Sequence, residues 1–254
     1  MLKNAALGAT GIILLSGSLL LLLFVILAGV SDVTPLKHTY FLQADTSGIS
    51  GARDTTQWTY FYFCGPDNND CGSARPAPAF GKAWDRDAEQ APDSLIGSRG
   101  GGTTSFHYFY MWRFAWVFIL ITLFFATLAW FAAWLACCGR LGAAIASLMA
   151  LAALFFHSLG TSMMTAVFVQ ARDAFQRDNR SAKVGSYAFG FMWASWFTLF
   201  VATILFIIGI KTSKSRKDTT ATATNGHTKR RWGRRNRSVR SSSYDGRRVK
   251  EEYA

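Results

Sequence analysis

The sequence predicts a mainly α-helical membrane protein, a bundle of four transmembrane helices with a disulfide-pinned extracellular loop that forms a small β-sheet. The first observation is that charged side chains are absent from four long stretches, residues 4–31, 114–139, 141–171 and 184–210. Each stretch exceeds the roughly 20 apolar residues that a helix needs to cross about 30 Å of hydrocarbon. The second is a pair of cysteines in the polar interval between the first two stretches. The third is a strongly basic C-terminal segment in a chain of net charge +12.

The first predicted transmembrane helix covers residues 5–30. A secretory signal peptide also begins with a basic residue and an apolar run, but its apolar core is usually about 7–15 residues long. The run here is longer, so we expect the helix to be retained in the protein. Cleavage after Ala28-Gly29-Val30 is the alternative, and the following loop lies outside in either case.

The distribution of basic residues predicts that both termini are cytoplasmic. The tail, 211–254, holds 14 Lys and Arg against 4 Asp and Glu, whereas the first loop, 31–111, holds 6 against 9. Lys and Arg collect on the cytoplasmic flanks of membrane helices. The short loop 170–183 holds four basic and two acidic residues, which mildly opposes this orientation, but the tail outweighs it. Both loops are therefore expected to be extracellular.

Two cysteines in the first loop, Cys64 and Cys71, are predicted to form a disulfide bond, because paired cysteines usually bridge in an oxidising compartment. The stretch between them, Gly65 to Asp70, is rich in turn-forming residues. The preceding segment, 57–63, is rich in aromatic residues and is predicted to be a strand that leads into the bridge. A zinc site needs four ligands, and no second Cys or His pair is nearby, so no metal is expected.

The last part of the first loop approaches the second predicted transmembrane helix, 112–136. Residues 97–104 are rich in Gly, Ser and Thr and are predicted to be flexible. The aromatic run 107–112 is predicted to lie at the boundary between water and lipid, where aromatic side chains form an interfacial belt.

Cys137 and Cys138 follow the second helix at its cytoplasmic end, beside Arg140. Juxtamembrane cysteines next to a basic residue are candidates for reversible S-palmitoylation. The alternative, that they are ordinary small residues, is equally consistent with the pattern.

The third and fourth predicted helices, 141–169 and 184–210, carry small residues at four-residue spacing. Small residues let helices approach closely in lipid, so these stripes predict helix contact faces. We favour contacts within one bundle, and contacts between copies in a homo-oligomer are the alternative. The stripes consist of Gly142, Ala146, Ala150, Ser158, Ser162 and Ala166, and of Ser186, Gly190, Ala194, Thr198 and Ala202.

His157 is the one ionisable side chain deep in a predicted span. Such a group is a functional hypothesis by default, but we favour a neutral imidazole bonded to a nearby Ser or Thr. The four spans contain no acidic residue, no second His and no Pro, and no nucleotide loop or nucleophile–base pair is present. We therefore expect no enzyme activity, no catalytic residues and no cofactor, and a transporter is a distant alternative.

Asn179 begins the sequence Asn-Arg-Ser, which is an N-glycosylation acceptor pattern in the second extracellular loop. We predict glycosylation at Asn179. The short distance to the fourth helix argues against it, so an unmodified residue is the alternative.

The tail is predicted to be disordered, with a basic cluster that binds anionic lipid at about 1 kcal/mol per basic residue near the surface. Phosphorylation of Ser238, which follows several arginines, would add roughly −2 charge and loosen this contact. Nucleic acid is not expected as a partner, because the lipid surface is the nearer anion for a tethered tail. The cluster consists of Lys229, Arg230, Arg231, Trp232, Arg234, Arg235, Arg237 and Arg240.

The first loop contains Thr34-Pro35-Leu36, the stretch 40–49 (Tyr-Phe-Leu-Gln-Ala-Asp-Thr-Ser-Gly-Ile), and the motif of Trp58, Thr59, Tyr60, Cys64 and Cys71. These runs resemble the fungal Sur-seven/PalI family of tetraspan plasma-membrane proteins, whose loop motif corresponds to the last five residues. The resemblance extends over the four-span layout but not the tail. The Trp followed by two Cys is also similar, more weakly, to the claudin arrangement.

The resemblance implies a multi-pass plasma-membrane protein in eisosome-associated domains, with eisosome or cortical proteins as partners. It further implies roles in membrane organisation, endocytosis and cell-wall integrity. The 44-residue tail favours the Sur-seven branch, since PalI members tend to have much longer tails. The alternatives are a PalI-like component of ambient-pH signalling and a claudin-like adhesion or cell-fusion protein.

Overall fold

The computed structural model describes residues 2–86, 88–135 and 140–224 of the 254-residue chain. Four long helices account for most of these residues: α1 (Leu2–Ile26), α2 (Phe106–Leu135), α3 (Arg140–Arg177) and α4 (Ser186–Thr224). Each contains a segment long and apolar enough to cross a membrane, namely Leu7–Ile26, Phe106–Trp134, Gly142–Arg177 and Ser186–Ile210. The predicted four-span fold is therefore confirmed.

The helix boundaries differ from the predicted spans at several ends. α2 begins at Phe106 rather than 112, and α3 continues to Arg177 rather than ending at 169. Both helices exceed the roughly 20 residues that a bilayer requires, and their extra turns pack against the loops, as described below. α4 is helical to Thr224, so its backbone includes residues 211–224, which were predicted to be disordered. The chain divides into two compact units, Met1–Lys211 and Thr212–Ala254, and the contacts described here belong to the first.

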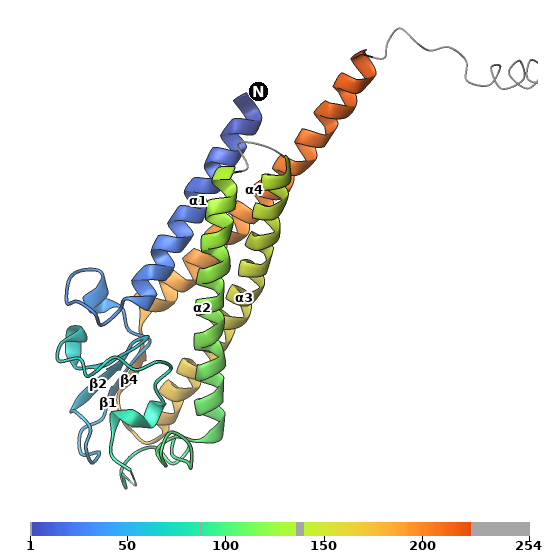
Figure 1. The fold of residues 1–254 in the computed structure, drawn as a ribbon. Coiled ribbons are helices and arrows are strands. Elements are labelled where there is room, and N and C mark those ends of the chain that lie inside the picture. Colours follow the sequence, from blue (N-terminus) through green and yellow to red (C-terminus); the bar gives the residue numbers. More distant parts are fainter. Residues whose placement is uncertain (1, 87, 136–139, 225–254) are drawn as a thin grey trace, which may run out of the picture. The chain divides into compact units, whose positions relative to one another are not determined.

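The two loops of this unit together form one small antiparallel sheet (Figure 1). The first loop contributes β1 (Leu42–Asp45), β2 (Thr55–Trp58) and β3 (Phe63–Cys64), and the second contributes β4 (Ala182–Val184). The strand order is β3-β2-β1-β4, with Leu42 of β1 opposite both Trp58 of β2 and Val184 of β4. The predicted sheet is confirmed, and the second loop completes it, which the sequence did not indicate.

We call residues 27–105 and 178–185 the loop layer. Within it the predicted strand 57–63 is two strands, because the chain turns between Thr59 and Tyr62, whose backbone groups are joined by a 3.0 Å hydrogen bond. The predicted flexible stretch 97–104 is a closed turn, in which the Thr103 and Thr104 N–H groups each donate to the Arg99 carbonyl at 3.0 Å. Three short 3₁₀ helices complete the layer: η1 (Leu36–His38), η2 (Pro66–Asn68) and η3 (Phe80–Ala83).

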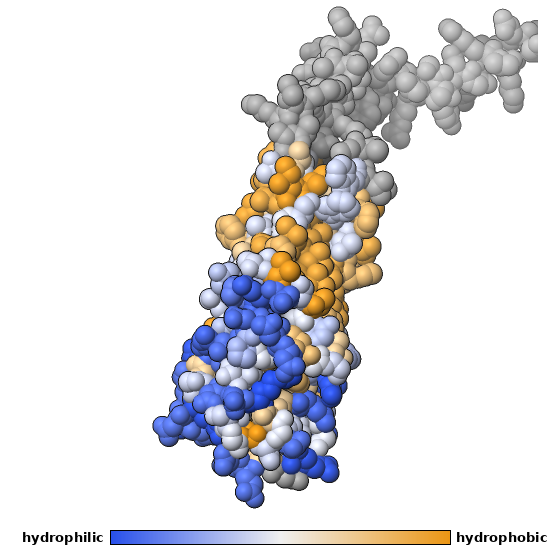
Figure 2. Space-filling view, turned by 90° about the vertical axis from the view of Figure 1, so that its left-hand side faces the viewer, coloured by the Kyte–Doolittle hydropathy of each residue, from blue (hydrophilic) through white to orange (hydrophobic). Residues whose placement is uncertain are grey.

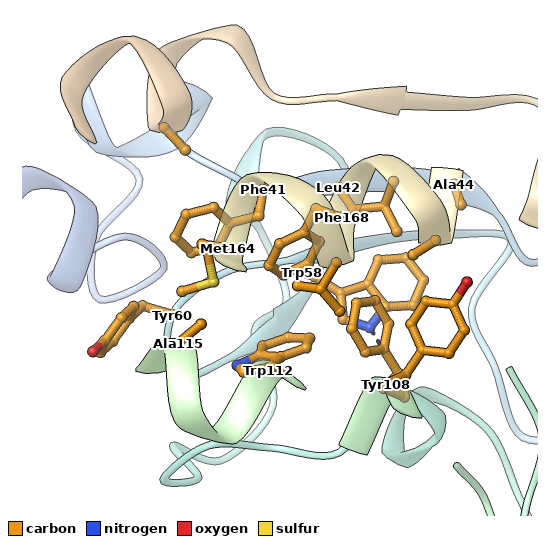
Figure 3. Packing of buried hydrophobic residues seen from close by; sticks show 14 of the residues in the cluster. Phe41, Leu42, Ala44, Trp58, Tyr60, Tyr108, Trp112, Ala115, Met164 and Phe168 are labelled. Carbon is orange, nitrogen blue, oxygen red and sulfur yellow. Dashed lines mark hydrogen bonds between the residues drawn. The ribbon is translucent and has the colours of Figure 1, made fainter. Parts of the chain in front are cut away.

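The main core is aromatic and joins the loop layer to the outer turns of α2 and α3 (Figure 3). Phe168 of α3 stacks on Phe41 at 5.0 Å between ring centroids and lies 4.8 Å from Trp112 of α2. Trp112 and Tyr108 are thus buried in this core rather than placed in an interfacial belt. The prediction of a belt over 107–112 was wrong for these two residues, because the loop layer covers the first turns of α2.

The opposite part of the bundle has a core of small side chains between α2 and α3, which include Ala126, Ala129, Ala146, Ala150 and Ala153. The outward side chains of the helices are large and apolar and include Ile13, Phe124, Phe131, Leu148, Phe155 and Phe197. Figure 2 shows this hydrophobic surface over the helices and a hydrophilic surface over the loop layer. This contrast is expected of a protein whose helices face lipid and whose loops face water.

Neither small-residue stripe is buried along its whole length. Ala146 and Ala150 of α3 are buried within the bundle, as predicted, whereas Ser162 of the same stripe is exposed. In α4, however, Ser186, Gly190 and Ala194 are exposed, and a Cβ atom built on Gly190 meets nothing within 4 Å. α4 instead buries a face that includes Ala188, Met192, Ser195 and Leu199. The intramolecular interpretation was therefore wrong for the outer half of the α4 stripe.

Candidate functional site

The five residues of the loop motif lie on the β2–β3 hairpin and the turn that follows it. Trp58 ends β2, opposite Phe63 of β3, and is fully buried. Its indole N–H donates to the Phe80 carbonyl at 3.4 Å, and its ring lies 5.8 Å from that of Phe175 on α3. A large ring at this position fills the space between the sheet and α3, so Trp58 is a packing residue of the site.

The next residues fasten the hairpin to α2. The Tyr60 hydroxyl donates to the Trp116 carbonyl at 2.7 Å, and the Trp116 indole N–H donates back to the Tyr60 carbonyl at 3.2 Å. Their rings stack at 5.4 Å. Burial raises the pKa of Tyr60 well above its ordinary value, so the phenol stays protonated and can donate this bond. Thr59 accepts the Tyr62 N–H with its hydroxyl and holds the turn in shape.

Cys64 and Cys71 form a disulfide bond, which confirms that prediction. The bridged turn is mostly exposed, but its Asn68 side chain points inward and is buried. The Asn68 side-chain amide donates to the carbonyls of Leu36 at 2.6 Å and Thr39 at 2.9 Å, and its backbone N–H donates to Gln57 Oε1 at 2.9 Å. The bridge therefore positions one amide that ties β2 to the entry segment of the loop.

An arginine of the second loop closes the layer from the other side. Arg180 donates to the Ser47 carbonyl at 2.8 Å and to the Gln90 carbonyl at 3.1 Å. Beside it, the Asp45 N–H donates to the Ser181 carbonyl at 2.8 Å and continues the β1–β4 pairing. The basic character of the second loop thus has a structural use, since one of its arginines satisfies backbone carbonyls of the first loop.

His157 lies in a buried polar network that connects three helices. Its Nδ1 is 2.8 Å from Thr161 Oγ1 on the same helix, and its Nε2 is 3.1 Å from Ser195 Oγ on α4. Ser195 Oγ in turn donates to the Ser18 carbonyl of α1 at 2.9 Å. The predicted bonding of His157 to neighbouring Ser and Thr hydroxyls is confirmed.

The other predicted sites have varied outcomes. Asn179 is exposed just after the end of α3, in a left-handed conformation with φ 58°. Cys137, Cys138, Ser238 and the basic cluster from Lys229 to Arg240 lie outside the described residues. Within the described residues, no group of three or more His, Cys, Asp or Glu side chains is placed to hold a metal ion.

Sequence reasoning missed several residues that hold the site together, notably Asn68, Arg180, Ser18 and Ser195. Asn68 carried a signal, since an Asn between two bridged cysteines in a turn is well suited to bond backbone groups. Arg180 and the two serines carried none, because their partners lie far away in the chain, up to 133 residues for Arg180 and 177 residues between Ser18 and Ser195.

The chain is similar in sequence to one family of known proteins. A family model described as the SUR7/PalI family matches residues 7–205. The SUR7 family protein FMP45 of Saccharomyces cerevisiae is 33% identical over 211 residues, which cover 79% of this chain and 65% of that protein. Protein SUR7 of Candida albicans is 32% identical over 209 residues, which cover 80% of this chain and 74% of that protein. The plasma membrane protein YNL194C of Saccharomyces cerevisiae is 33% identical over 207 residues.

Proposed function

The chain belongs to the SUR7/PalI family, and from this membership we propose that it is a non-enzymatic organiser of the plasma membrane that resides in eisosome-associated domains. In this role it supports membrane and cortical organisation, endocytosis and cell-wall integrity. A relative is described as a plasma membrane protein, and the four apolar helices suit a multi-pass protein of that membrane.

The observation that carries the proposal is the continuous core between the loop layer and the helices. Trp58, Phe41 and Tyr60 of the loops pack in one buried cluster with Trp112 and Phe168 of the helices. A loop layer packed on the helices in this way keeps a fixed position relative to the membrane. It therefore presents a fixed surface to partners outside the membrane. This arrangement suits a structural element better than a catalyst, whose site needs convergent polar groups in a pocket.

The proposed orientation places the loop layer outside and both termini in the cytoplasm. The Cys64–Cys71 disulfide supports it, because such bonds persist in oxidising compartments. The basic tail then faces the cytoplasmic leaflet, where anionic lipid attracts it. Cortical proteins and further copies of the chain are its proposed protein partners.

Imaging in living fungal cells tests the proposal. A C-terminally tagged copy is followed beside an eisosome coat marker, with fluorescence recovery after bleaching. We expect immobile cortical patches that overlap the marker. A matched variant with the seven Lys and Arg of 229–240 changed to Gln should weaken patch retention while leaving the protein in the plasma membrane.

A uniform, mobile signal in the plasma membrane, or a signal on endosomes, would overturn the proposal. A PalI-like role in ambient-pH signalling would then take first place and would require a growth defect at alkaline pH without a patch defect. A claudin-like role would instead require that changes in the loop layer abolish cell contact while patches persist.

A further inference from the structure

The turn from Arg99 to Thr104 in the loop layer has an unusual concentration of backbone donors. It contains three successive glycines, Gly100, Gly101 and Gly102, all with positive φ of 65°, 85° and 86°. Non-glycine residues rarely adopt this conformation, so the glycines determine the path of the turn. Their N–H groups donate no hydrogen bond to any described residue, whereas the N–H groups of Thr103 and Thr104 both do. In other proteins, concavities formed by successive backbone N–H groups bind anions.

Two cations lie directly against this turn. The ammonium nitrogen of Lys82 is 3.1 Å from the position that a Cβ atom on Gly101 would occupy, and Nε of Arg86 is 2.9 Å from the corresponding position on Gly102. The Arg86 Nε also donates to the Gly101 carbonyl at 3.1 Å. A side chain on either glycine would displace these groups, so the glycines keep both cations close to the backbone.

Buried neighbours fix the backbone positions of Lys82 and Arg86. Lys82 belongs to η3, whose Phe80 is fully buried in the aromatic core. The Gly81 N–H donates to Thr104 Oγ1 at 2.9 Å and joins η3 to the turn. The buried Trp84 fixes the chain between the two cations. The packing of the core therefore fixes the backbone that carries both cations, while their side chains lie exposed beside the glycine turn.

Carboxylates do not neutralise these cations within the described residues. The ion pairs there join His38 to Asp67, Arg53 to Asp70 and Arg172 to Asp173. Asp85, the nearest described acid in sequence, lies against Gly51 on another turn. Asp87 lies outside the described residues. Two cations beside N–H groups that bond no described residue, with no described carboxylate paired to them, favour a bound anion.

We propose that Lys82, Arg86 and the glycine turn 100–102 form a binding site for a phosphate-type oxyanion. The Arg86 guanidinium and the Lys82 ammonium supply charge-assisted donors, and the glycine N–H groups supply neutral ones. This combination of a glycine-rich turn with Lys and Arg is the chemistry that recognises phosphate elsewhere.

The site takes its phosphate from a solute or a carbohydrate outside the membrane rather than from a lipid headgroup. The loop layer already contacts α2 at Trp116, so the segment from Phe106 to Trp116 runs beside the layer. At 1.5 Å per residue this segment is about 15 Å long. The headgroup region adds only about 5–8 Å to each side of the hydrocarbon. A hydrocarbon boundary at Trp116 therefore leaves the turn beyond the headgroups, given the proposed orientation.

Calorimetric titration of the purified full chain in dodecyl maltoside, a detergent without phosphate, tests the site. Inorganic phosphate and mannose 6-phosphate are titrated at constant ionic strength, with mannose as the uncharged comparison. We expect saturable binding of both phosphates and none of mannose. The K82Q/R86Q double variant should weaken phosphate binding by at least about tenfold, since hydrogen bonds to charged groups are the stronger ones.

A charge-matched control separates the site from general attraction. Lys183 and Arg75 are exposed cations of the same layer, and the K183Q/R75Q variant removes the same charge. It should bind phosphate as the unchanged protein does. An intact disulfide and an unchanged unfolding midpoint without phosphate show that each variant is folded. Absence of saturable binding in the unchanged protein, or equal weakening in both variants, would overturn the site.

A second titration experiment identifies the source of the phosphate. The chain is placed in nanodiscs of zwitterionic lipid with and without anionic lipid, and mannose 6-phosphate is titrated again. Unchanged binding supports a solute or carbohydrate phosphate. Binding that is blocked by anionic lipid and restored in its absence would overturn this source in favour of a lipid headgroup. Neither result affects the proposed residence in membrane domains, which is tested separately by imaging.

Discussion

At the scale of single residues, the loop layer depends on side chains that reach between segments rather than on side chains in one strand. Tyr60 and Trp116 exchange hydrogen bonds in both directions, and Asn68 serves two carbonyls of the entry segment. These bonds are buried or partly buried, so removing one partner leaves an unsatisfied group, which costs up to about 1–3 kcal/mol. These side chains thus attach the sheet to α2 and to the entry segment of the first loop.

The disulfide provides the first prediction. Cys64→Ser opens a loop whose ends are 7 residues apart, and the chain-entropy estimate for such a loop is about 2.5 kcal/mol. We expect the loop layer to lose about this much stability and to become sensitive to protease, as measured by thermal unfolding and limited proteolysis. Ser73→Ala, exposed just past the same bridged turn, is the control and should change little. Equal stability of the two variants would contradict a structural role for the bridge.

Asn179 provides the second prediction. The residue is exposed beyond α3, whose outer turns run beside the loop layer, so the membrane does not shield it. We propose that it carries an N-linked glycan in a secretory host. Treatment with an endoglycosidase should increase gel mobility, and N179Q should abolish the shift.

The chain contains its own control for this prediction, because Asn236-Arg237-Ser238 has the same acceptor pattern in the tail. N236Q should leave the shift unchanged if the tail is cytoplasmic. A shift that disappears in N236Q instead would reverse the proposed orientation, and the absence of any shift would show that Asn179 is unmodified.

At the scale of elements, β4 is the strand that makes two loops into one layer. It pairs with β1, and the Gly185 N–H that follows it donates to the Phe41 carbonyl at 3.0 Å. A Cβ atom on Gly185 would collide with the backbone of Tyr40, which cannot move without breaking the sheet. Gly185 is therefore required by close packing between two backbones.

A pair of glycine variants tests this element. Gly185→Ala should destabilise the loop layer by at least about 2 kcal/mol, in the range for overpacked sites. Gly190→Ala, five residues further along and inside α4, meets open space and should leave the protein at least as stable, because Ala favours the helix more than Gly. Thermal unfolding of both variants in detergent measures the difference. Similar midpoints for the two would mean that β4 does not pair with β1 as described.

At the scale of the whole molecule, buried hydroxyl groups and one imidazole connect α1, α3 and α4 within the apolar bundle. Hydrogen bonds between membrane helices average about 0.6 kcal/mol and reach about 1.7 kcal/mol. They are too weak to hold the bundle alone, but their geometry fixes the rotation of each helix about its axis.

A double-mutant cycle measures this network. Ser195→Ala should destabilise the bundle by about 1–2 kcal/mol, because it removes bonds to both Ser18 and His157. The S18A/S195A double variant should cost less than the sum of the single variants, since the two hydroxyls bond each other at 2.9 Å. Ser162→Ala on the exposed face of α3 is the control. Additive losses, or a loss at Ser162 as large as that at Ser195, would contradict the network.

The amino-acid sequence by itself determined the four spans, the bridge between Cys64 and Cys71 and the general position of the sheet. Hydropathy is summed over neighbouring residues, so a charge-free run predicts a membrane helix without any knowledge of its partners. A pair of cysteines in one short turn is likewise a local feature. The pairing of His157 with hydroxyls followed from the cost of an unbonded polar group in an apolar span.

Only the tertiary structure decided which helix faces are buried, where β4 pairs and how Lys82 and Arg86 meet the glycine turn. In lipid, small residues permit a contact but do not require it, so the stripe on α4 could not be assigned to one side from its spacing. The extra turns of α2 and α3 and the burial of Trp112 depend on a loop layer built from segments far apart in the chain. Such contacts depend on the packing of the whole molecule, and a pattern within one segment does not encode them.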